Sequence, residues 1–146
     1  TMGGWDEEVW FSLFQIAVLS ERLAEPAVQV SAAYLAAFNA RPSRAEPLVD
    51  LARFHRLRGE YGLAYLYARQ ASEMKQPADR LFMDHSTYAW RALDEVAISA
   101  FYAGTAEALA AGKSAASALL SPESGLPAAE AERVRRNAGF YGVTGT

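Results

Sequence analysis

Apolar residues along this chain recur at intervals of three and four positions, which is the period of an amphipathic α-helix. No segment keeps the alternation of period two that is typical of a half-buried strand. The pattern therefore predicts an all-α protein. We expect helices over about 5–23, 26–40, 43–58, 60–75 and 87–103, a sixth that ends near 120, and a last one over 127–142.

Prolines, glycines and short polar side chains mark the expected helix ends. Pro26 and Pro127 suit the first turn of a helix, where the missing N–H costs nothing. Gly59 suits a left-handed turn after a helix. Ser43 and Glu46 have the spacing of a capping box, in which each side chain accepts a hydrogen bond from a free backbone N–H.

The helices come in pairs that repeat along the chain. A shift of 34 residues places Phe14 on Leu48 and Ala37 on Ala71. The third pair fits only after a longer shift, from Gly59 to Gly104, so the segment around 81–91 holds an insertion. We expect one domain over 5–142, with helix pairs over 5–40, 43–75 and 87–120 and a capping helix over 127–142. Residues 1–4 are expected to be a tag remnant or flexible start, and 143–146 a flexible tail.

Small residues stand where a core would ordinarily hold bulk. Ala52, Ala64 and Ala71 are expected to be the points where the two helices of a pair approach closely, because a larger side chain there would overpack the contact. Tyr61, with Tyr65 or Tyr67, is expected to fill the space between neighbouring pairs. Neither helix of a pair buries its apolar face alone, and stacking of the pairs buries both.

The second pair resembles a tetratricopeptide repeat (TPR). It carries the bulky, small, glycine, aromatic and proline positions of that motif at Leu48, Leu51, Ala52, Gly59, Tyr61, Ala64, Ala71 and Pro77. His55 stands at a position that is usually aromatic, and Ala68 replaces a large residue. The first and third pairs keep fewer of the positions. The resemblance implies a superhelical stack of antiparallel helix pairs, an α-solenoid, that acts as a protein-binding scaffold.

A narrower resemblance covers most of 5–141. The segments "WDEEVWFSLFQIAVLSERL", "LARFHRLRGEYGLAYLYAR" and "WRALDEVAISAFYAG" are similar to the helical repeat region that follows the catalytic domain in some bacterial family-2 glycosyltransferases. This resemblance implies an accessory region of a larger glycosyltransferase-like protein. The acidic metal-binding motif of the nucleotide-sugar domain has no counterpart in this sequence.

Composition and charge argue against several classes of function. The chain has 146 residues, a net charge of −3 and no cysteine. The charge gives no reason to expect nucleic acid as a partner, since its binders usually carry a basic field. The absence of cysteine removes thiol catalysis and thiolate zinc sites and suits a reducing compartment, so we expect a cytoplasmic protein. No apolar run approaches the ~18 residues of a membrane span.

Candidate catalytic residues are few. His55 and His85 are the only histidines, and His55 is expected to be a packed, hydrogen-bonded core residue. Asp79, Asp84 and His85 could ligate a metal ion, but their spacing matches no specific site, and aspartate before a helix is usually a cap. No phosphate loop, nucleophile elbow or zinc spacing is present. We expect no catalysis by this chain alone and no cofactor or metal.

The first helix of each pair is expected to line a concave groove that binds a protein or peptide. Positions spaced three and four apart put its candidate residues on one face of each helix. The candidates are Gln15, Arg22, Arg44, Glu46, Arg53, Arg56, Arg91 and Asp94. Arginine forks suit carboxylates, so one hypothesis is an acidic, extended peptide partner. The alternative is a solvated arginine face that is paired internally with Glu46 and Asp94.

The first helix, "VWFSLFQIAVL", is apolar nearly all round, although a terminal repeat should have a polar outer face. Trp5, Trp10, Phe11 and Phe14 form a candidate association face, covered either by a preceding domain or by a second copy of the chain. The alternative is that this helix is enclosed within the fold, under the loop that contains "RLFM".

The leading functional hypothesis is a non-catalytic interaction or scaffold module. Two alternatives stay open: a helical domain that binds a small ligand or metal through the Asp79–His85 loop and Arg91, and a homodimeric structural module.

Overall fold

The computed structural model describes residues 3–79 and 82–144. This part of the chain is helical and contains no strand. The α-helices are α1 (Gly3–Arg22), α2 (Ala27–Ala40), α3 (Glu46–Leu57), α4 (Tyr61–Ser72), α5 (Ala92–Ala103), α6 (Ala106–Leu119) and α7 (Ala128–Gly139). A π-helical turn, η1 (Thr87–Arg91), leads directly into α5, and a 3-10 turn, η2 (Pro122–Ser124), precedes α7. The prediction of an all-α protein is confirmed.

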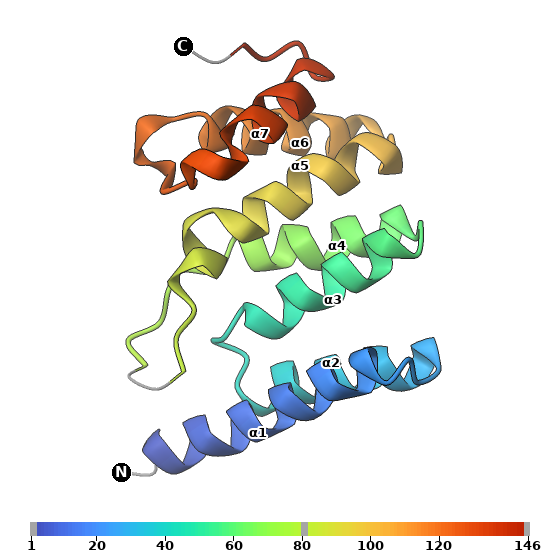
Figure 1. Ribbon diagram of the computed structural model, residues 1–146, viewed down its shortest axis with the longest axis vertical. Coiled ribbons are helices and arrows are strands. Elements are labelled where there is room, and N and C mark those ends of the chain that lie inside the picture. The colour runs from blue at the N-terminus through green and yellow to red at the C-terminus, as the bar shows by residue number, and fades with distance from the viewer. Residues whose placement is uncertain (1–2, 80–81, 145–146) are drawn as a thin grey trace.

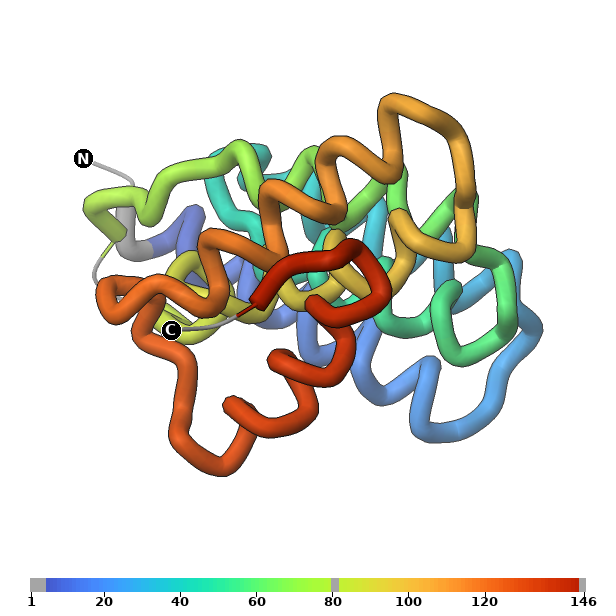
Figure 2. Tube along the Cα trace, turned by 90° about the horizontal axis from the view of Figure 1, so that it is seen from above, coloured from blue at the N-terminus to red at the C-terminus, as the bar shows by residue number. Residues whose placement is uncertain are grey.

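The helices follow one another along the long axis of the molecule, with α1 at one end and α7 at the other (Figure 1). Each α-helix packs against the next one in the chain. Viewed along the stack, the helices overlap in layers (Figure 2). The two ends of the chain consequently lie at opposite ends of the molecule.

The predicted helix positions agree with the structure to within a few residues, with two differences. The Ser43–Glu46 capping box is not formed: α3 begins at Glu46 after Ala45, and no side chain caps it. Glu46 instead pairs with Arg44 and accepts a hydrogen bond from Tyr88. The fifth helix begins with the π-helical turn η1, which the period of three and four did not indicate.

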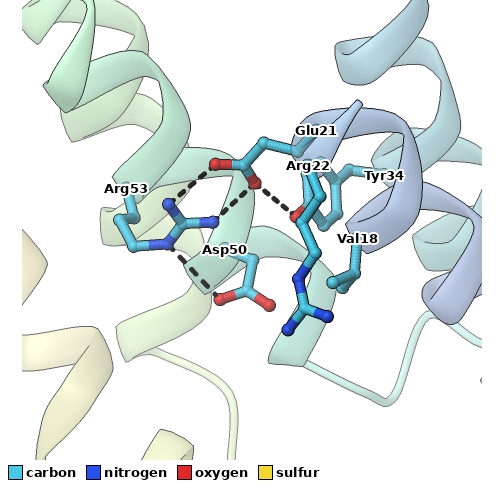
Figure 3. Close-up of a pocket in the computed structure, with 6 residues that line it drawn as sticks. All are labelled: Val18, Glu21, Arg22, Tyr34, Asp50 and Arg53. Carbon is cyan, nitrogen blue, oxygen red and sulfur yellow. Dashed lines mark hydrogen bonds and ion pairs between the residues drawn. The ribbon is translucent and has the colours of Figure 1, made fainter. Parts of the chain in front are cut away.

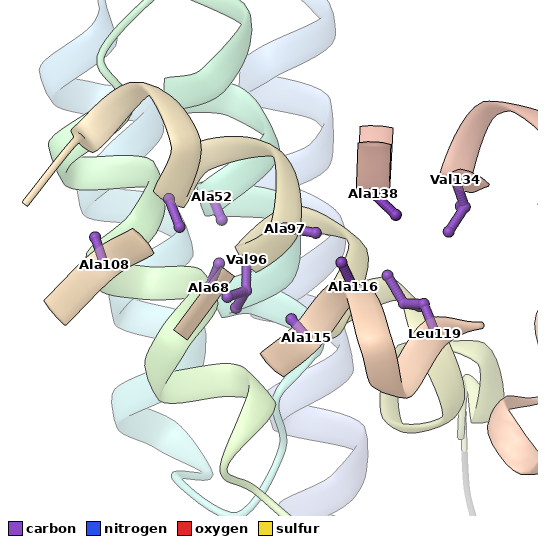
Figure 4. Close-up of a cluster of buried hydrophobic side chains, with 11 residues drawn as sticks. Ala52, Ala68, Val96, Ala97, Ala108, Ala115, Ala116, Leu119, Val134 and Ala138 are labelled. Carbon is purple, nitrogen blue, oxygen red and sulfur yellow. The ribbon is translucent and has the colours of Figure 1, made fainter. Parts of the chain in front are cut away.

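Alanine dominates the core where helices approach most closely. Ala52, Ala64 and Ala71 are almost completely buried, as the repeat pattern predicts. The largest buried cluster draws most of its members from alanines of α3 to α7 (Figure 4). Tyr67 of α4 packs against each of the three buried clusters that the described residues form, and it fills space between neighbouring helices. Small residues thus set the distance between the helices, and a few aromatic side chains fill the remaining space between them.

Two glycines in helices provide a test of this close packing. A Cβ on Gly112 in α6 would overlap the Tyr141 hydroxyl and lie 2.9 Å from the Ala100 Cβ, whereas a Cβ on Gly62 in α4 would meet nothing within 4 Å. Gly112→Ala should lower the free energy of unfolding by about 1–2 kcal/mol, because overpacking outweighs the gain in helix propensity. Gly62→Ala should raise it by about 0.5 kcal/mol. Urea unfolding of both variants checks this, and effects of the same sign would contradict it.

Candidate functional site

Side chains from α1, α2, α3, η1, α5 and α7 line two adjoining cavities on one side of the stack. The first has a volume of about 380 Å³ and is lined by Val18, Glu21, Arg22, Tyr34, Asp50 and Arg53 (Figure 3). The second, of about 400 Å³, is lined by Arg53, Arg56, Trp90, Arg91, Asp94, Glu95, Ile98, Glu130, Arg133 and Asn137. Arg53 belongs to both, so the cavities form one continuous surface. These lining residues are called the arginine surface below.

The first cavity is organised by Glu21 at the end of α1. Its carboxylate accepts two hydrogen bonds from the Arg53 guanidinium, at 2.8 and 2.6 Å, and a third from the Tyr34 hydroxyl at 2.6 Å (Figure 3). Burial alone would raise the pKa of Glu21, but the hydrogen bonds from Arg53 and Tyr34 bring it below its usual value. Asp50 lies 3.8 Å from Arg53 Nε. Its burial raises the pKa of Asp50, against the opposing effect of Arg91 and Arg53.

Ion pairs continue through the second cavity. Arg56 donates to both oxygens of Glu95 at 2.7 and 3.1 Å, and Arg133 of α7 donates to both oxygens of Asp94 at 3.1 and 2.9 Å. Arg91 reaches Asp50 at 3.2 Å and Asp84 at 3.0 Å. Because these pairs join α1 to α3, α3 to α5 and α5 to α7, they hold the arginine forks in fixed positions along the stack.

Some arginines of this surface lie further out than their carboxylate partners. The side chains of Arg53, Arg56, Arg91 and Arg133 are 25–33% exposed, whereas those of Glu21, Asp50, Asp94 and Glu95 are 9–19% exposed. Two other carboxylates lie nearer to solvent, since Glu130 is 38% exposed and Asp84 is 45% exposed. At Arg53 and Arg56 a partner that approaches from solvent therefore meets the guanidinium group before it meets the carboxylates. A guanidinium carries five N–H donors, and a bidentate pair uses two of them, so such a fork can also bind a second acceptor.

The π-helical turn η1 contributes Trp90 and Arg91 to the second cavity. A π-turn adds a residue to the local helical turn and changes the direction of the side chains, and such turns are frequent at functional sites. Trp90 is the aromatic member of this cavity, and Ile98 adds a second apolar contact. The surface thus offers apolar area beside the arginine forks.

Five of the eight predicted groove residues line these cavities: Arg22, Arg53, Arg56, Arg91 and Asp94. Gln15 is exposed on α1 but lines neither cavity. Arg44 and Glu46 differ from the expectation, since both are buried and neither lines the arginine surface. The sequence alternative named Glu46 and Asp94 as internal partners of the groove arginines. In the structure Asp94 pairs with Arg133 of α7, and Glu46 pairs with the buried Arg44.

Arg44 is fully buried at the centre of a separate cluster. Its guanidinium donates to Glu46 at 2.8 and 3.1 Å, to Asp79 at 3.2 Å and to the carbonyl oxygen of Phe82 at 2.6 Å. It also lies 3.9 Å from the centre of the Trp10 ring. Hydrogen bonds from Arg41, with a smaller contribution from Arg44, hold the pKa of Asp79 below its usual value. The cluster fastens the inserted segment that follows α4 onto α1 and α3.

The contacts of the inserted segment cover part of the predicted association face on α1. Trp10 is fully buried, and its ring stacks on Phe14 at 5.4 Å between centroids. Phe11 is covered by Phe82 of the inserted segment, with ring centroids 3.9 Å apart. The sequence alternative, in which the "RLFM" loop encloses this side of the helix, fits these contacts; Arg80 and Leu81 lie outside the described residues. Trp5 alone of the four predicted residues is largely exposed, at 62%.

The candidate metal ligands do not converge. Asp79 pairs with Arg41 and Arg44, Asp84 accepts hydrogen bonds from Ser86 and Arg91, and His85 Nδ1 lies 2.9 Å from Gln76. Among the described residues, no group of three or more potential ligands could hold a metal ion.

The core position expected for His55 is confirmed. It is 6% exposed, Nδ1 lies 3.0 Å from Glu60, and its ring stacks on Tyr67.

Sequence reasoning missed several members of the arginine surface, chiefly Glu21, Asp50, Trp90, Glu95 and Arg133. Arg133 and Glu130 of the last helix both line the second cavity. The spacing of three between Glu130 and Arg133 was the available signal, since it places the two on one helical face.

Comparisons with known proteins leave the family open. No protein-family model matches the chain, and searches of curated proteins and of solved structures find no match. In the described part of the chain, none of the helices combines the length and the apolar character that crossing a bilayer requires.

Proposed function

We propose that this chain is a TPR-like α-solenoid of three antiparallel helix pairs and a capping helix, and that it binds a protein partner through the arginine surface. The observation that carries the proposal is the continuous surface built by α1, α2, α3, η1, α5 and α7, in which the forks of Arg53 and Arg56 lie outside the carboxylates that orient them. In this proposal the chain is a non-catalytic accessory region of a larger glycosyltransferase-like protein, as the sequence resemblance implies.

An extended, acidic peptide segment suits this surface best. The two cavities together extend from α1 to α7, which favours an elongated ligand over a compact one. Carboxylates of such a peptide would meet the outward N–H groups of Arg53, Arg56 and Arg91. Trp90 and Ile98 offer a place for one apolar side chain between these charges. The ion pairs hold the guanidinium groups in place before a peptide binds, which reduces the conformational entropy lost on binding.

A binding experiment tests this assignment. Fluorescence polarisation of a labelled alternating Glu-Ala peptide should show saturable binding that weakens as salt is added, and a Lys-Ala peptide should bind far less tightly. Arg56→Gln and Arg91→Gln should each weaken binding about tenfold, because a charge-assisted hydrogen bond is lost.

Arg69→Gln serves as the matched control, since Arg69 is an exposed, ion-paired arginine of α4 outside the arginine surface. Equal binding of the acidic and basic peptides, or an equal loss from Arg69→Gln, would contradict the proposal. Circular dichroism of each variant confirms that the helices are intact.

A further inference from the structure

The outer face of α1 carries an apolar stripe that no part of the described chain covers. Trp5, Ile16, Leu19 and Leu23 are 54–63% exposed and Val9 is 39% exposed. With the exposed Ser12, these residues occupy positions 5, 9, 12, 16, 19 and 23. At 100° per residue the six positions, the last of them one residue beyond the end of α1, fall on one narrow face, opposite the buried Trp10 and Ala17 and the partly buried Phe14. They are called the α1 stripe below.

The spacing of the α1 stripe is self-complementary. Its intervals are four, three, four, three and four, so the stripe has the same order from either end. Two antiparallel copies related by a two-fold axis at position 14 place Trp5 against Leu23, Val9 against Leu19, and Ser12 against Ile16 of the second copy. Every stripe residue then meets another stripe residue, which is the condition for an isologous dimer interface.

Charges beside the stripe fit the same arrangement. Glu8, Gln15 and Arg22 are exposed and follow one flank of the stripe at intervals of seven. In the antiparallel pair, Glu8 faces Arg22 of the second copy, Gln15 faces its own equivalent, and Arg22 faces Glu8. Neither Glu8 nor Arg22 forms an ion pair within the part of the chain that the structure describes. Flanking charges of this kind set the orientation of paired helices.

If the two α1 helices were parallel, Glu8 and Arg22 would not face oppositely charged side chains of the second copy. The flank of Glu8 and Arg22 would then face the opposite flank of the second copy, which holds Asp6, Leu13 and Ser20. Asp6 would meet Glu8 as a like charge. Leu13 and Ser20 carry no charge, and Ser20 is buried within its own chain. The antiparallel orientation is therefore the one that both the apolar and the charged positions favour.

The neighbouring helix α2 extends the same face. Its outer side exposes Val28, Ala32, Leu35 and Asn39, at intervals of four, three and four, which are again symmetric about their midpoint. Phe14 and Tyr34 are in ring contact, with centroids 6.3 Å apart, so the middle of α1 lies beside the middle of α2. A single two-fold axis can consequently pass through the midpoint of the α1 stripe and the midpoint of the exposed row on α2. The exposed apolar area of the two helices is on the order of several hundred Å², close to the ~800 Å² per partner of a specific interface.

We propose that the outer faces of α1 and α2 form the interface of a two-fold symmetric homodimer, in which α1 packs antiparallel against α1 of a second copy. Apart from Arg22, which also lines the first cavity, the interface lies outside the arginine surface, and it does not depend on the function proposed for that surface. The α1 stripe would then be buried in the assembly, which accounts for a terminal helix that is apolar on both sides.

Light scattering coupled to size-exclusion chromatography, from low micromolar to near-millimolar concentration, tests the dimer. The parent chain should be dimeric at the upper concentrations. Ile16→Glu should raise the dimer Kd by roughly 100-fold or more, because the interface would bury two unpaired carboxylates. Leu66→Glu is the matched control: Leu66 is also 57% exposed but lies on α4, and its substitution should leave the Kd unchanged.

Two further variants test the orientation. Glu8→Arg should weaken the dimer, and the added substitution Arg22→Glu should restore it, because the exchanged charges again face each other. The chain has no cysteine, so Gln15→Cys should give a disulfide-linked dimer on mild oxidation, whereas Gln70→Cys on α4 should not. A parent that stays monomeric at near-millimolar concentration, or a dimer that Ile16→Glu leaves intact, would overturn the proposal.

Discussion

Arg44→Met is expected to lower the free energy of unfolding by about 3–5 kcal/mol, since it breaks a buried ion-pair network by removing one partner. Arg44 is fully buried, and its two carboxylate partners, Glu46 and Asp79, are only 4% and 8% exposed. Methionine retains most of the volume of the side chain but leaves Glu46 without its cation. It also removes the hydrogen bond to the Phe82 carbonyl and the contact over Trp10. Chemical denaturation monitored by circular dichroism measures the loss.

A double-mutant cycle separates the charge effect from the packing effect. Adding Glu46→Gln to Arg44→Met should recover part of the loss, because the uncompensated carboxylate is then removed while the hydrogen bond from Tyr88 can persist. Arg44→Lys should fall between the parent and Arg44→Met, since an ammonium group cannot form the same bidentate contacts. Strictly additive effects, or a loss below about 1 kcal/mol for Arg44→Met, would contradict the role assigned to this cluster.

Helix positions could be predicted from the sequence because they depend on local features. The apolar period and the joints at Pro26, Gly59 and Gly104 placed every α-helix to within a few residues. The alanine positions also carried information beyond secondary structure, because a small residue at Ala52 or Ala64 indicates close approach wherever the partner helix lies. Both inferences need only the chain itself and no knowledge of distant contacts.

The inserted segment could not be predicted in the same way. Its contacts join residues far apart in the sequence, such as Arg44 with Asp79 and Phe11 with Phe82. A capping box at Ser43 and Glu46 was a reasonable local prediction, yet Glu46 is taken up by Arg44 and Tyr88. The buried ion pair with Arg44 and the long-range hydrogen bond from Tyr88 together outweigh a capping interaction worth only ~1 kcal/mol.

The candidate site was predictable in position but not in detail. Arg53, Arg56 and Arg91 follow from helix spacing alone, since they lie on the faces of α3 and of the η1 turn before α5 that line the cavities. Their partners Glu21, Glu95 and Asp50 depend on which helix lies opposite and at what register. The depth of Glu21 and Glu95 beneath Arg53 and Arg56 is a property of packed helices and has no signature in the sequence.

Trp10→Ala is expected to cost about 3–5 kcal/mol of unfolding free energy, whereas Trp5→Ala on the same helix should change it by less than about 0.5 kcal/mol. Trp10 is fully buried and Trp5 is 62% exposed. The Trp10 ring packs on Phe14 and beneath the Arg44 guanidinium, so its removal leaves a large cavity and takes away a cation–π contact. Both variants are compared in the Ile16→Glu background, so that self-association through the α1 stripe does not enter the measurement.

A third variant distinguishes the ring from its N–H group. The indole N–H of Trp10 is buried and has no hydrogen-bond partner among the described residues, and an unpaired buried donor costs free energy. Trp10→Phe keeps an aromatic face for Arg44 and removes this donor, so it should lose only about 1–2 kcal/mol, less than half the loss of Trp10→Ala. Equal losses for Trp10→Phe and Trp10→Ala would show that the indole N–H has a partner after all. Equal losses for Trp5→Ala and Trp10→Ala would instead place Trp5 within the fold and contradict an exposed α1 stripe.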